Sequence, residues 1–268
     1  MEKVTVAIHK LTSCSGCQLA FINQGMALLD LLNYVEIRHF IEGGINNPDC
    51  PVDVAFVEGS ISTPHDLERI KSVREQSKLI VTLGACATSG GVQALRNIAA
   101  LYGSAQTMKA GVYASPDFIA TLDNSEPVAS IIKVDYELWG CPVSAQQLSH
   151  FLSQLLLGAE PKVEKEKLCM ECKRNQTVCV LVTRQAPCLG PVTRTGCGAM
   201  CPSYGKACYN CYGPSEQPNT RALANRLHGL GMVEQDIAHR FAQMHSHTPQ
   251  FRKEIEHWTE LSTKGENK

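Results

Sequence analysis

Eight cysteines lie close together in the second half of the chain, between Cys169 and Cys211. They form two successive groups of four: Cys169, Cys172, Cys179 and Cys188, followed by Cys197, Cys201, Cys208 and Cys211. Thiols at this density either pair as disulfides or bind metal as thiolates. The choice between these two chemistries is the first step toward a function.

The composition of the chain favours metal over disulfides. Its thirteen cysteines are an odd number, which does not suit a fully paired framework. The N-terminal sequence MEKVTVAIHKLTSC carries no export signal, and no stretch approaches the ~20 apolar residues of a membrane span. We therefore expect a cytoplasmic protein with no membrane partner, where reducing thiol pools keep disulfides rare. A net charge of −1 and 6% aromatic residues also argue against nucleic acid as a partner.

Strands and helices alternate along the first part of the chain. Compact runs rich in β-branched residues predict strands at 3–9, 34–40, 52–57, 78–83 and 131–134. Helical periodicity predicts helices at 18–29, 63–73, 92–101 and 144–158. This alternation predicts an α/β domain, a doubly wound parallel sheet of the flavodoxin-like type.

Four further cysteines, Cys14, Cys17, Cys86 and Cys141, each follow a predicted strand. Because sites in open parallel sheets form beyond the carboxyl ends of the strands, these four thiols should meet at one rim. Cys17 also opens a helix, whose positive dipole end favours a thiolate. A redox pair of Cys14 and Cys17 is the simpler alternative, but two more cysteines converge on the same rim. Cys50 precedes the third strand and belongs at the opposite edge, so we expect an ordinary free thiol there.

A charged stretch from 162 to 167, after Pro161, predicts a linker. It divides the chain into a flavodoxin-like domain at 1–160 and a second domain at 161–268.

The second domain is expected to be small and irregular. Residues 168–214 are rich in turn residues and have little hydrophobic periodicity, so bound metal must organise them. Two polar-faced helices are predicted after this segment, at 221–230 and 234–258.

The cysteine spacing favours iron–sulfur clusters without excluding zinc. Zinc sites commonly use two Cys-x-x-Cys pairs separated by a modest loop, whereas each group here contains one such pair. Cys141-Pro142 and Cys201-Pro202 resemble the Cys-Pro ending of ferredoxin ligand runs. Twelve cysteines in three groups of four suggest a series of clusters that carries electrons.

Motifs for binding a substrate or nucleotide are not evident. The chain has no G-x-G-x-x-G between a strand and a helix, no G-x-x-x-x-G-K-[ST] and no C-x-x-C-H. His245-Ser-His247 has a metal-like spacing, but a polar surface stretch is the simpler interpretation, as for the other histidines. The sequence therefore indicates an electron-carrying subunit of a larger enzyme.

These motifs resemble those of the small subunits of nickel–iron hydrogenases. The family's proximal-cluster signatures match, in order, Cys14-Ser-Gly-Cys17, Val57-Glu-Gly-Ser-Ile61, Gly84-Ala-Cys-Ala-Thr-Ser-Gly-Gly91 and Gly140-Cys-Pro142. Its C-terminal cluster segment matches Cys188-Leu-Gly-Pro191, Cys197 and Cys208-x-x-Cys211. The resemblance spans about residues 3–215.

The resemblance implies three 4Fe-4S clusters, each held by four cysteines. The proximal cluster would be held by Cys14, Cys17, Cys86 and Cys141. The medial cluster would be held by Cys197, Cys201, Cys208 and Cys211, and the distal cluster by Cys169, Cys172, Cys179 and Cys188. Glu58 matches a family acid near the proximal site, although a glutamate at a strand end can also be merely solvated. No residue of this chain is expected to be catalytic.

Two departures from the respiratory type of this family indicate its cytoplasmic group. That type commonly has a histidine and a proline at the positions that are Cys169 and Cys201 here. The chain resembles the delta subunits of NADP-linked hydrogenases (sulfhydrogenases), or the small subunit of methyl-viologen-reducing hydrogenase. The sequence from Cys208 to Pro214 favours the first.

The resemblance also implies partners. They are a nickel–iron large subunit, which activates hydrogen, and a flavin/iron–sulfur diaphorase-type or heterodisulfide-reductase-type subunit linked to NAD(P). Two alternatives remain open at this point. The related 20-kDa subunit of respiratory complex I has a single cluster and would not need the second and third groups. A zinc-stabilised scaffold or interaction protein would use the cysteines for structure alone.

Overall fold

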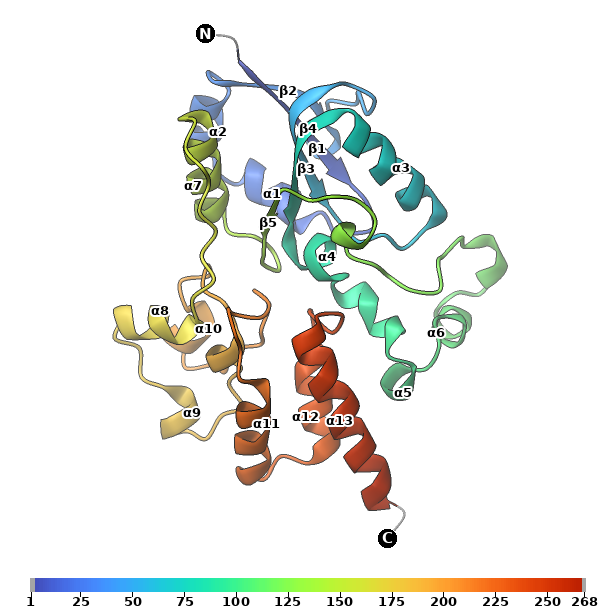
Figure 1. Cartoon of the computed structure of the whole chain (residues 1–268), viewed down its shortest axis with the longest axis vertical. Coiled ribbons are helices and arrows are strands. Elements are labelled where there is room, and N and C mark those ends of the chain that lie inside the picture. Colours follow the sequence, from blue (N-terminus) through green and yellow to red (C-terminus); the bar gives the residue numbers. More distant parts are fainter. Residues whose placement is uncertain (1–2, 267–268) are drawn as a thin grey trace.

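The computed structural model describes residues 3–266 and contains a five-stranded sheet with helices on both faces (Figure 1). Its strands are β1 (Val4–Lys10), β2 (Val35–Phe40), β3 (Val52–Glu58), β4 (Ser77–Leu83) and β5 (Tyr136–Leu138). All neighbouring strands are parallel, in the order β2-β1-β3-β4-β5. This is the flavodoxin-like order, so the predicted doubly wound sheet is confirmed.

Helices cover both faces of the sheet. Those of the first half are α1 (Gly16–Ile22), α2 (Met26–Leu31), α3 (Pro64–Glu75), α4 (Gly84–Ser89), α5 (Ala99–Tyr102), α6 (Ala105–Val112) and α7 (Ala145–Leu156). Phe21 of α1 and Phe151 of α7 pack against Phe56 of β3 on one face. Ile70 and Val73 of α3 belong to the core on the other face. Burial on both faces explains why these strands are nearly continuous apolar runs.

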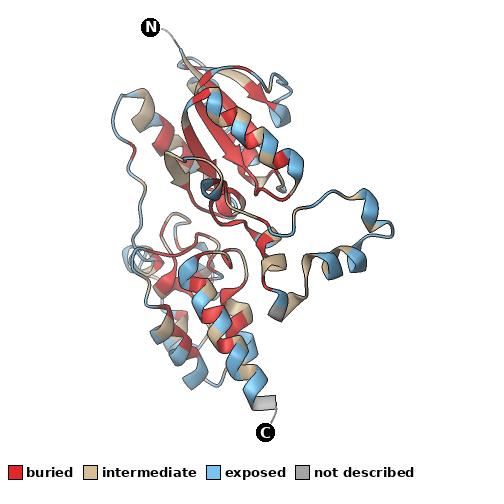
Figure 2. Ribbon diagram, turned by 45° about the vertical axis from the view of Figure 1, so that its right-hand side comes forward, coloured by how far each residue is buried: buried red, intermediate tan, exposed pale blue. Residues whose placement is uncertain are grey.

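The second half lies below the sheet in Figure 1. Its helices are α8 (Leu168–Arg174), α9 (Val180–Thr183), α10 (Met200–Ser203), α11 (Thr220–Gly229), α12 (Glu234–Phe241) and α13 (Pro249–Glu266). The last three pack around a core that includes Phe241, Phe251 and Ile255 (Figure 2). Ile98, from the segment before α5, belongs to the same core. The two halves therefore share a hydrophobic cluster.

Short 3₁₀ helices complete the secondary structure, at Ile41–Gly43, Val92–Asn97, Pro116–Phe118, Val128–Ser130 and Gly190–Val192. Residues 159–166 connect α7 to α8 without helix or strand and are largely exposed. Division of the chain at 160/161 stays our prediction. Across residues 3–266, no helix combines the length and apolar composition needed to cross a membrane.

The predicted helix at 18–29 is wrong in two respects. It is interrupted after Ile22, because Gly25 adopts a φ of 58° before α2 begins. Leu19 and Met26, which define the periodicity, are 45% and 72% exposed, so they do not face the core. The four spaced apolar residues of this stretch therefore mark a surface of the protein.

The last strand was predicted too early. Val128–Ser130 forms a 3₁₀ turn, and strand pairing starts only at Tyr136. The Asp135 carboxylate accepts a hydrogen bond from the Ile80 backbone N–H at 2.8 Å and another from Arg74 at 2.9 Å. The Asp135 backbone N–H also donates to the Ile80 carbonyl oxygen at 3.0 Å, so hydrogen bonding with β4 begins at this residue.

The predicted helix at 234–258 is two helices, α12 and α13, separated by residues 242–248. His245 is completely buried in the interruption, and its own contacts replace a helical turn. Pro249 then begins α13, where its missing N–H costs nothing. The predicted helix at 92–101 is likewise split, into a 3₁₀ turn and α5.

Candidate cluster-binding sites

Loops at the carboxyl edge of the sheet bring the first group of cysteines together. Cys14 follows β1, Cys17 lies in α1, Cys86 lies in α4 after β4, and Cys141 follows β5. Burial, and then the Cys141 and Cys14 thiols, raise the pKa of Cys86 to about 12. The pKa of Cys17 is raised by burial and also by Glu58, Cys86 and Cys141. The four sulfurs are therefore within electrostatic reach of one another, and Cys14 and Cys141 are exposed.

Two glycines bring the backbone close to these sulfurs. A Cβ on Gly84, whose φ is 79°, would collide with the Cys17 Sγ and lie 3.1 Å from the Gly140 carbonyl oxygen. A Cβ on Gly91, whose φ is 62°, would lie 2.7 Å from the Cys86 Sγ. Both the positive φ and the lack of room require glycine. The two residues therefore keep side-chain atoms away from the thiols.

We expect Gly84→Ala to empty the first site. The added methyl occupies the position of the Cys17 sulfur, and overpacking with a strained φ costs about 1–3 kcal/mol. Iron per chain should fall by about four in the purified protein. Gly111→Ala is the matched control, because a Cβ at this exposed helical position meets nothing within 4 Å. Equal iron contents in the two variants would contradict the assignment of this site.

Glu58, at the end of β3, holds the start of α1. Its carboxylate is 2% exposed and accepts hydrogen bonds from the backbone N–H groups of Cys17, at 3.0 Å, and Gln18, at 3.2 Å. Burial raises its pKa, while these two N–H groups lower it. Because a carboxylate at a helix N-terminus satisfies otherwise unpaired donors, Glu58 fixes the backbone that carries Cys17. The simple interpretation of Glu58 as a solvated residue is wrong.

The later cysteines also gather in two sets. Burial, followed by Cys169, Cys188 and Cys179, raises the pKa of Cys172 to about 11. These four thiols surround the start of α8 and the loops on both sides of α9. A Cβ on Gly190 would lie 3.4 Å from the Cys188 Sγ and 3.7 Å from the Cys169 Sγ. Glycine again leaves room beside the sulfurs.

The last set surrounds α10 and the loop after it. Burial comes first among the causes that raise the pKa of Cys211 to about 12, followed by Cys197, Cys141 and Cys201. Burial is the main cause that raises the pKa of the Cys208 thiol, and Cys188 and Cys211 raise it further. The set of Cys197, Cys201, Cys208 and Cys211 therefore has neighbours in both other sets.

Interactions between cysteines of different sets show which sets are adjacent. Cys211 interacts electrostatically with Cys141 of the first set. The Cys208 backbone N–H donates a hydrogen bond to the Cys188 Sγ at 3.3 Å. The set formed by Cys197 to Cys211 thus lies between the other two.

Glu171 ties the two later sets together, which sequence reasoning missed. It lies between Cys169 and Cys172, yet its carboxylate accepts hydrogen bonds from the backbone N–H groups of Gly196 and Ala199, both at 2.9 Å. These donors flank Cys197, so one set supplies the anion that orders the loop of the other. The one signal in the sequence was an acidic residue inside a Cys-x-x-Cys pair.

The donor set fits iron–sulfur clusters. Burial comes first among the causes that raise the pKa values of eight of the twelve thiols, and a cationic group among them would favour their thiolate forms. Backbone N–H groups already point at sulfur, since Asn210 donates to the Cys208 Sγ at 3.3 Å, and such bonds tune cluster potentials. Within residues 3–266, no group of three or more His, Cys, Asp or Glu side chains is placed to hold a single metal ion.

Cys50 lies apart from the three sets. It precedes β3 and is 6% exposed, within the hydrophobic cluster that contains Leu11 and Val52. Burial raises its pKa, and its charged neighbours include Arg38 and Arg69. These surroundings are those of a structural thiol.

His245 was wrongly interpreted as part of a polar surface stretch. Its side chain is 0% exposed, and burial lowers its pKa to about 4. The neighbouring Ser246 is also buried, and His247 is 26% exposed beside Glu126 at 3.4 Å.

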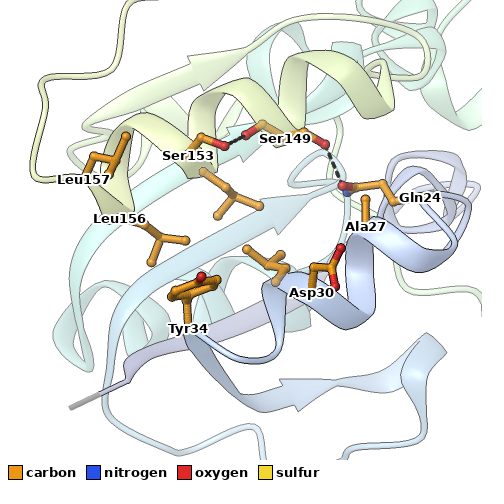
Figure 3. A pocket seen from close by; sticks show the side chains of 10 residues that line it. Gln24, Ala27, Asp30, Tyr34, Ser149, Ser153, Leu156 and Leu157 are labelled. Carbon is orange, nitrogen blue, oxygen red and sulfur yellow. Dashed lines mark hydrogen bonds between the residues drawn. The ribbon is translucent and has the colours of Figure 1, made fainter. Parts of the chain in front are cut away.

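A separate pocket of ≈ 470 Å³ lies between α2 and α7 (Figure 3). Ser149 donates a hydrogen bond to the Gln24 side chain at 2.7 Å across it. Tyr34, just before β2, and Leu157, after α7, line its outer end. It therefore opens toward the amino edge of the sheet, away from the cysteines.

Comparison with known proteins identifies the family to which this chain belongs. The model of the NADH ubiquinone oxidoreductase 20 Kd subunit family matches residues 14–155, more than half of the chain. The delta subunit of sulfhydrogenase 2 from Pyrococcus furiosus is 35% identical over 233 residues, covering 87% of this chain and 95% of that protein. An NAD⁺-reducing [NiFe]-hydrogenase chain in the H₂-reduced state is 27% identical with a TM-score of 0.54, covering 60% of this chain and 96% of that one. The chain belongs to the nickel–iron hydrogenase small-subunit family.

A further hydrogenase relative leads to the same conclusion. One subunit of the vhu F420-non-reducing hydrogenase from Methanococcus voltae is 32% identical over 259 residues, covering 86% of this chain and 90% of that protein. The chain is thus an electron-transfer subunit of an oxidoreductase complex that acts on hydrogen. Membership of this family also implies iron–sulfur clusters and a large-subunit partner.

Proposed function

We propose that this small subunit relays electrons through three 4Fe-4S clusters in a cytoplasmic nickel–iron hydrogenase. Electrons would pass, in either direction, between the hydrogen-activating site of the large subunit and a flavin- and NAD(P)-binding partner. The observation that carries the proposal is the serial order of three four-thiol sets, in which one set interacts electrostatically with the first and is hydrogen-bonded to the other. A structural role for the cysteines requires no such order.

Each set has its own cluster in this proposal. The proximal ligands are Cys14, Cys17, Cys86 and Cys141. The medial ligands are Cys197, Cys201, Cys208 and Cys211, and the distal ligands are Cys169, Cys172, Cys179 and Cys188. A bound 4Fe-4S cluster supplies reversible one-electron transfer. The chain itself supplies thiolates, burial, and backbone N–H groups aimed at sulfur, which together set the potential.

The two ends of the series have exposed thiols, which supports contact with partners there. Cys14 and Cys141 are exposed at the proximal end, and Cys179 at the distal end. Val178 and Val182, on either side of Cys179, are 68% and 73% exposed. Residues 167–206 carry six basic side chains and one acidic side chain, in a chain of net charge −1. Exposed apolar side chains within a predominantly basic segment suit an acidic partner protein.

The NADP-linked subgroup is the form of this proposal that we favour. The relative at 35% identity is a sulfhydrogenase delta subunit, and the structural neighbour at 27% identity is named as NAD⁺-reducing. Both names support a diaphorase-type partner. A heterodisulfide-reductase-type partner is the second form of the proposal.

Purification of the native complex tests this function. We expect a nickel-containing large subunit and a flavin-containing subunit to co-purify with the chain, and the complex to reduce NADP or a viologen dye with hydrogen. Absence of a nickel protein would remove the hydrogenase assignment. A complex that reduces viologen with hydrogen but lacks flavin would contradict only the diaphorase-type partner and would leave the hydrogenase assignment intact.

A further inference from the structure

His245 lies where the two halves of the protein meet. It belongs to the loop between α12 and α13, and its ring is 0% exposed. Its Nδ1 lies 2.6 Å from the hydroxyl oxygen of Ser89, and its Nε2 lies 3.0 Å from the carbonyl oxygen of Cys211. Ser89 ends α4, the helix that carries Cys86. One side chain therefore joins the backbone of a medial ligand to the helix of a proximal ligand.

The chemistry of these partners fixes the hydrogen-bond directions. A carbonyl oxygen only accepts, so Nε2 carries the proton and donates to Cys211. Nδ1 of the neutral ring then accepts from the Ser89 hydroxyl, whose single proton it shares with the Ala85 carbonyl oxygen 2.9 Å from that hydroxyl. Both ring nitrogens are satisfied only while the two halves are docked.

Trp139 adds a third contact to the same junction. Its ring is 5.3 Å from the His245 ring, and it precedes Cys141 by two residues. Gly213, two residues after Cys211, packs so closely on Trp139 that a Cβ there would collide with the indole. The residues packed against His245 are therefore close in sequence to both Cys141 and Cys211.

We infer that His245 is a positioning residue that fixes the separation of the proximal and medial clusters and so sets the rate of electron transfer between them. The inference rests on the proposed function. A single electron leaves one site and enters the other, with no bond made or broken and no proton transferred. Because tunnelling weakens steeply with distance, a junction held by buried hydrogen bonds serves this step better than one held by apolar packing alone.

Four variants of the native complex test the inference. His245→Leu removes both hydrogen bonds, and Ser89→Ala removes one with little change in volume. His245→Gln can retain both hydrogen bonds, because the amide nitrogen of the new glutamine can donate to the Cys211 carbonyl oxygen. The amide oxygen of the glutamine can accept from the Ser89 hydroxyl. His228→Leu is the matched control, because His228 is half-exposed and pairs with Glu234 within the second half.

Docking of the two halves is measured by trypsin cleavage after Arg194, whose guanidinium group packs over the Trp139 ring at the junction. We expect His245→Leu to accelerate cleavage about tenfold or more, because two buried hydrogen bonds are lost. This measurement reads backbone cleavage and not electron transfer, so it stays informative if the proposed function fails.

Positioning itself is measured by electron paramagnetic resonance of the reduced complex. We expect His245→Leu to weaken the magnetic interaction between two clusters and slow hydrogen-driven viologen reduction, with iron content unchanged. Ser89→Ala should have a smaller effect in the same direction, and His245→Gln should restore the wild-type spectrum. An unchanged interaction in both His245→Leu and Ser89→Ala would overturn the inference. Loss of iron in proportion to activity in both variants would also overturn it, since His245 would then act in assembly.

Discussion

Replacing Cys14 with serine is expected to abolish electron output from the assembled complex. Cys14 is an exposed member of the proximal set, and its sulfur interacts with Cys86 and Cys141. A serine hydroxyl keeps its proton far more strongly than a thiol, so it is a poor ligand for a soft metal site. Hydrogen-dependent viologen reduction should fall to background, and iron per chain should fall by about four.

Cys50→Ser is the matched control for this loss. Cys50 is buried in the hydrophobic cluster around Val52, away from the three sets. A hydroxyl in this position costs about 1–3 kcal/mol of stability, without touching the path of electrons. Thermal unfolding should therefore shift downward while viologen reduction is retained. Equal loss of electron output in the two variants would mean that the proximal ligands are wrongly chosen.

Removing iron is expected to unfold the cysteine-rich segment and leave the sheet folded. The hydrophobic cluster of this segment is small, and two of its buried members, Cys188 and Cys208, are themselves proposed ligands. The sheet has its own cores on both faces. After anaerobic chelation, residues 168–214 should lose protection from hydrogen exchange, whereas β1, β3 and β4 should retain it.

The metal content of the untreated protein distinguishes iron–sulfur clusters from structural zinc sites. Three clusters require about twelve irons and about twelve acid-labile sulfides per chain. Near-stoichiometric zinc without absorption in the visible range would contradict the electron relay. Protection of residues 168–214 that survives complete removal of iron would contradict the structural role of the clusters.

The sheet and the convergence of the proximal thiols could be predicted because both follow from local patterns. Buried parallel strands are short apolar runs, and parallel topology sends the carboxyl end of each strand to one edge. Cys14, Cys86 and Cys141 each follow such a run. The short strand β5 was misplaced because its start is set by Asp135, whose backbone N–H and carboxylate both bond to the Ile80 backbone across the sheet.

The remaining errors concern contacts between residues far apart in the sequence. The break between α12 and α13 depends on partners of His245, one of which, Ser89, is 156 residues away. Glu171 acts on the loop around Cys197, although it lies within another Cys-x-x-Cys pair. Periodicity and motif spacing report only near neighbours in the chain, so neither contact leaves a local pattern.

The position of His245 in the chain has a consequence for biosynthesis. All twelve proposed ligands precede it, so the ribosome completes every thiol set before it makes the residue that joins the two halves. At about 5–20 residues per second, the 34 residues from Cys211 to His245 take about 2–7 seconds to synthesise. In this order of synthesis, every proposed ligand is in the chain before the junction between the two halves can close.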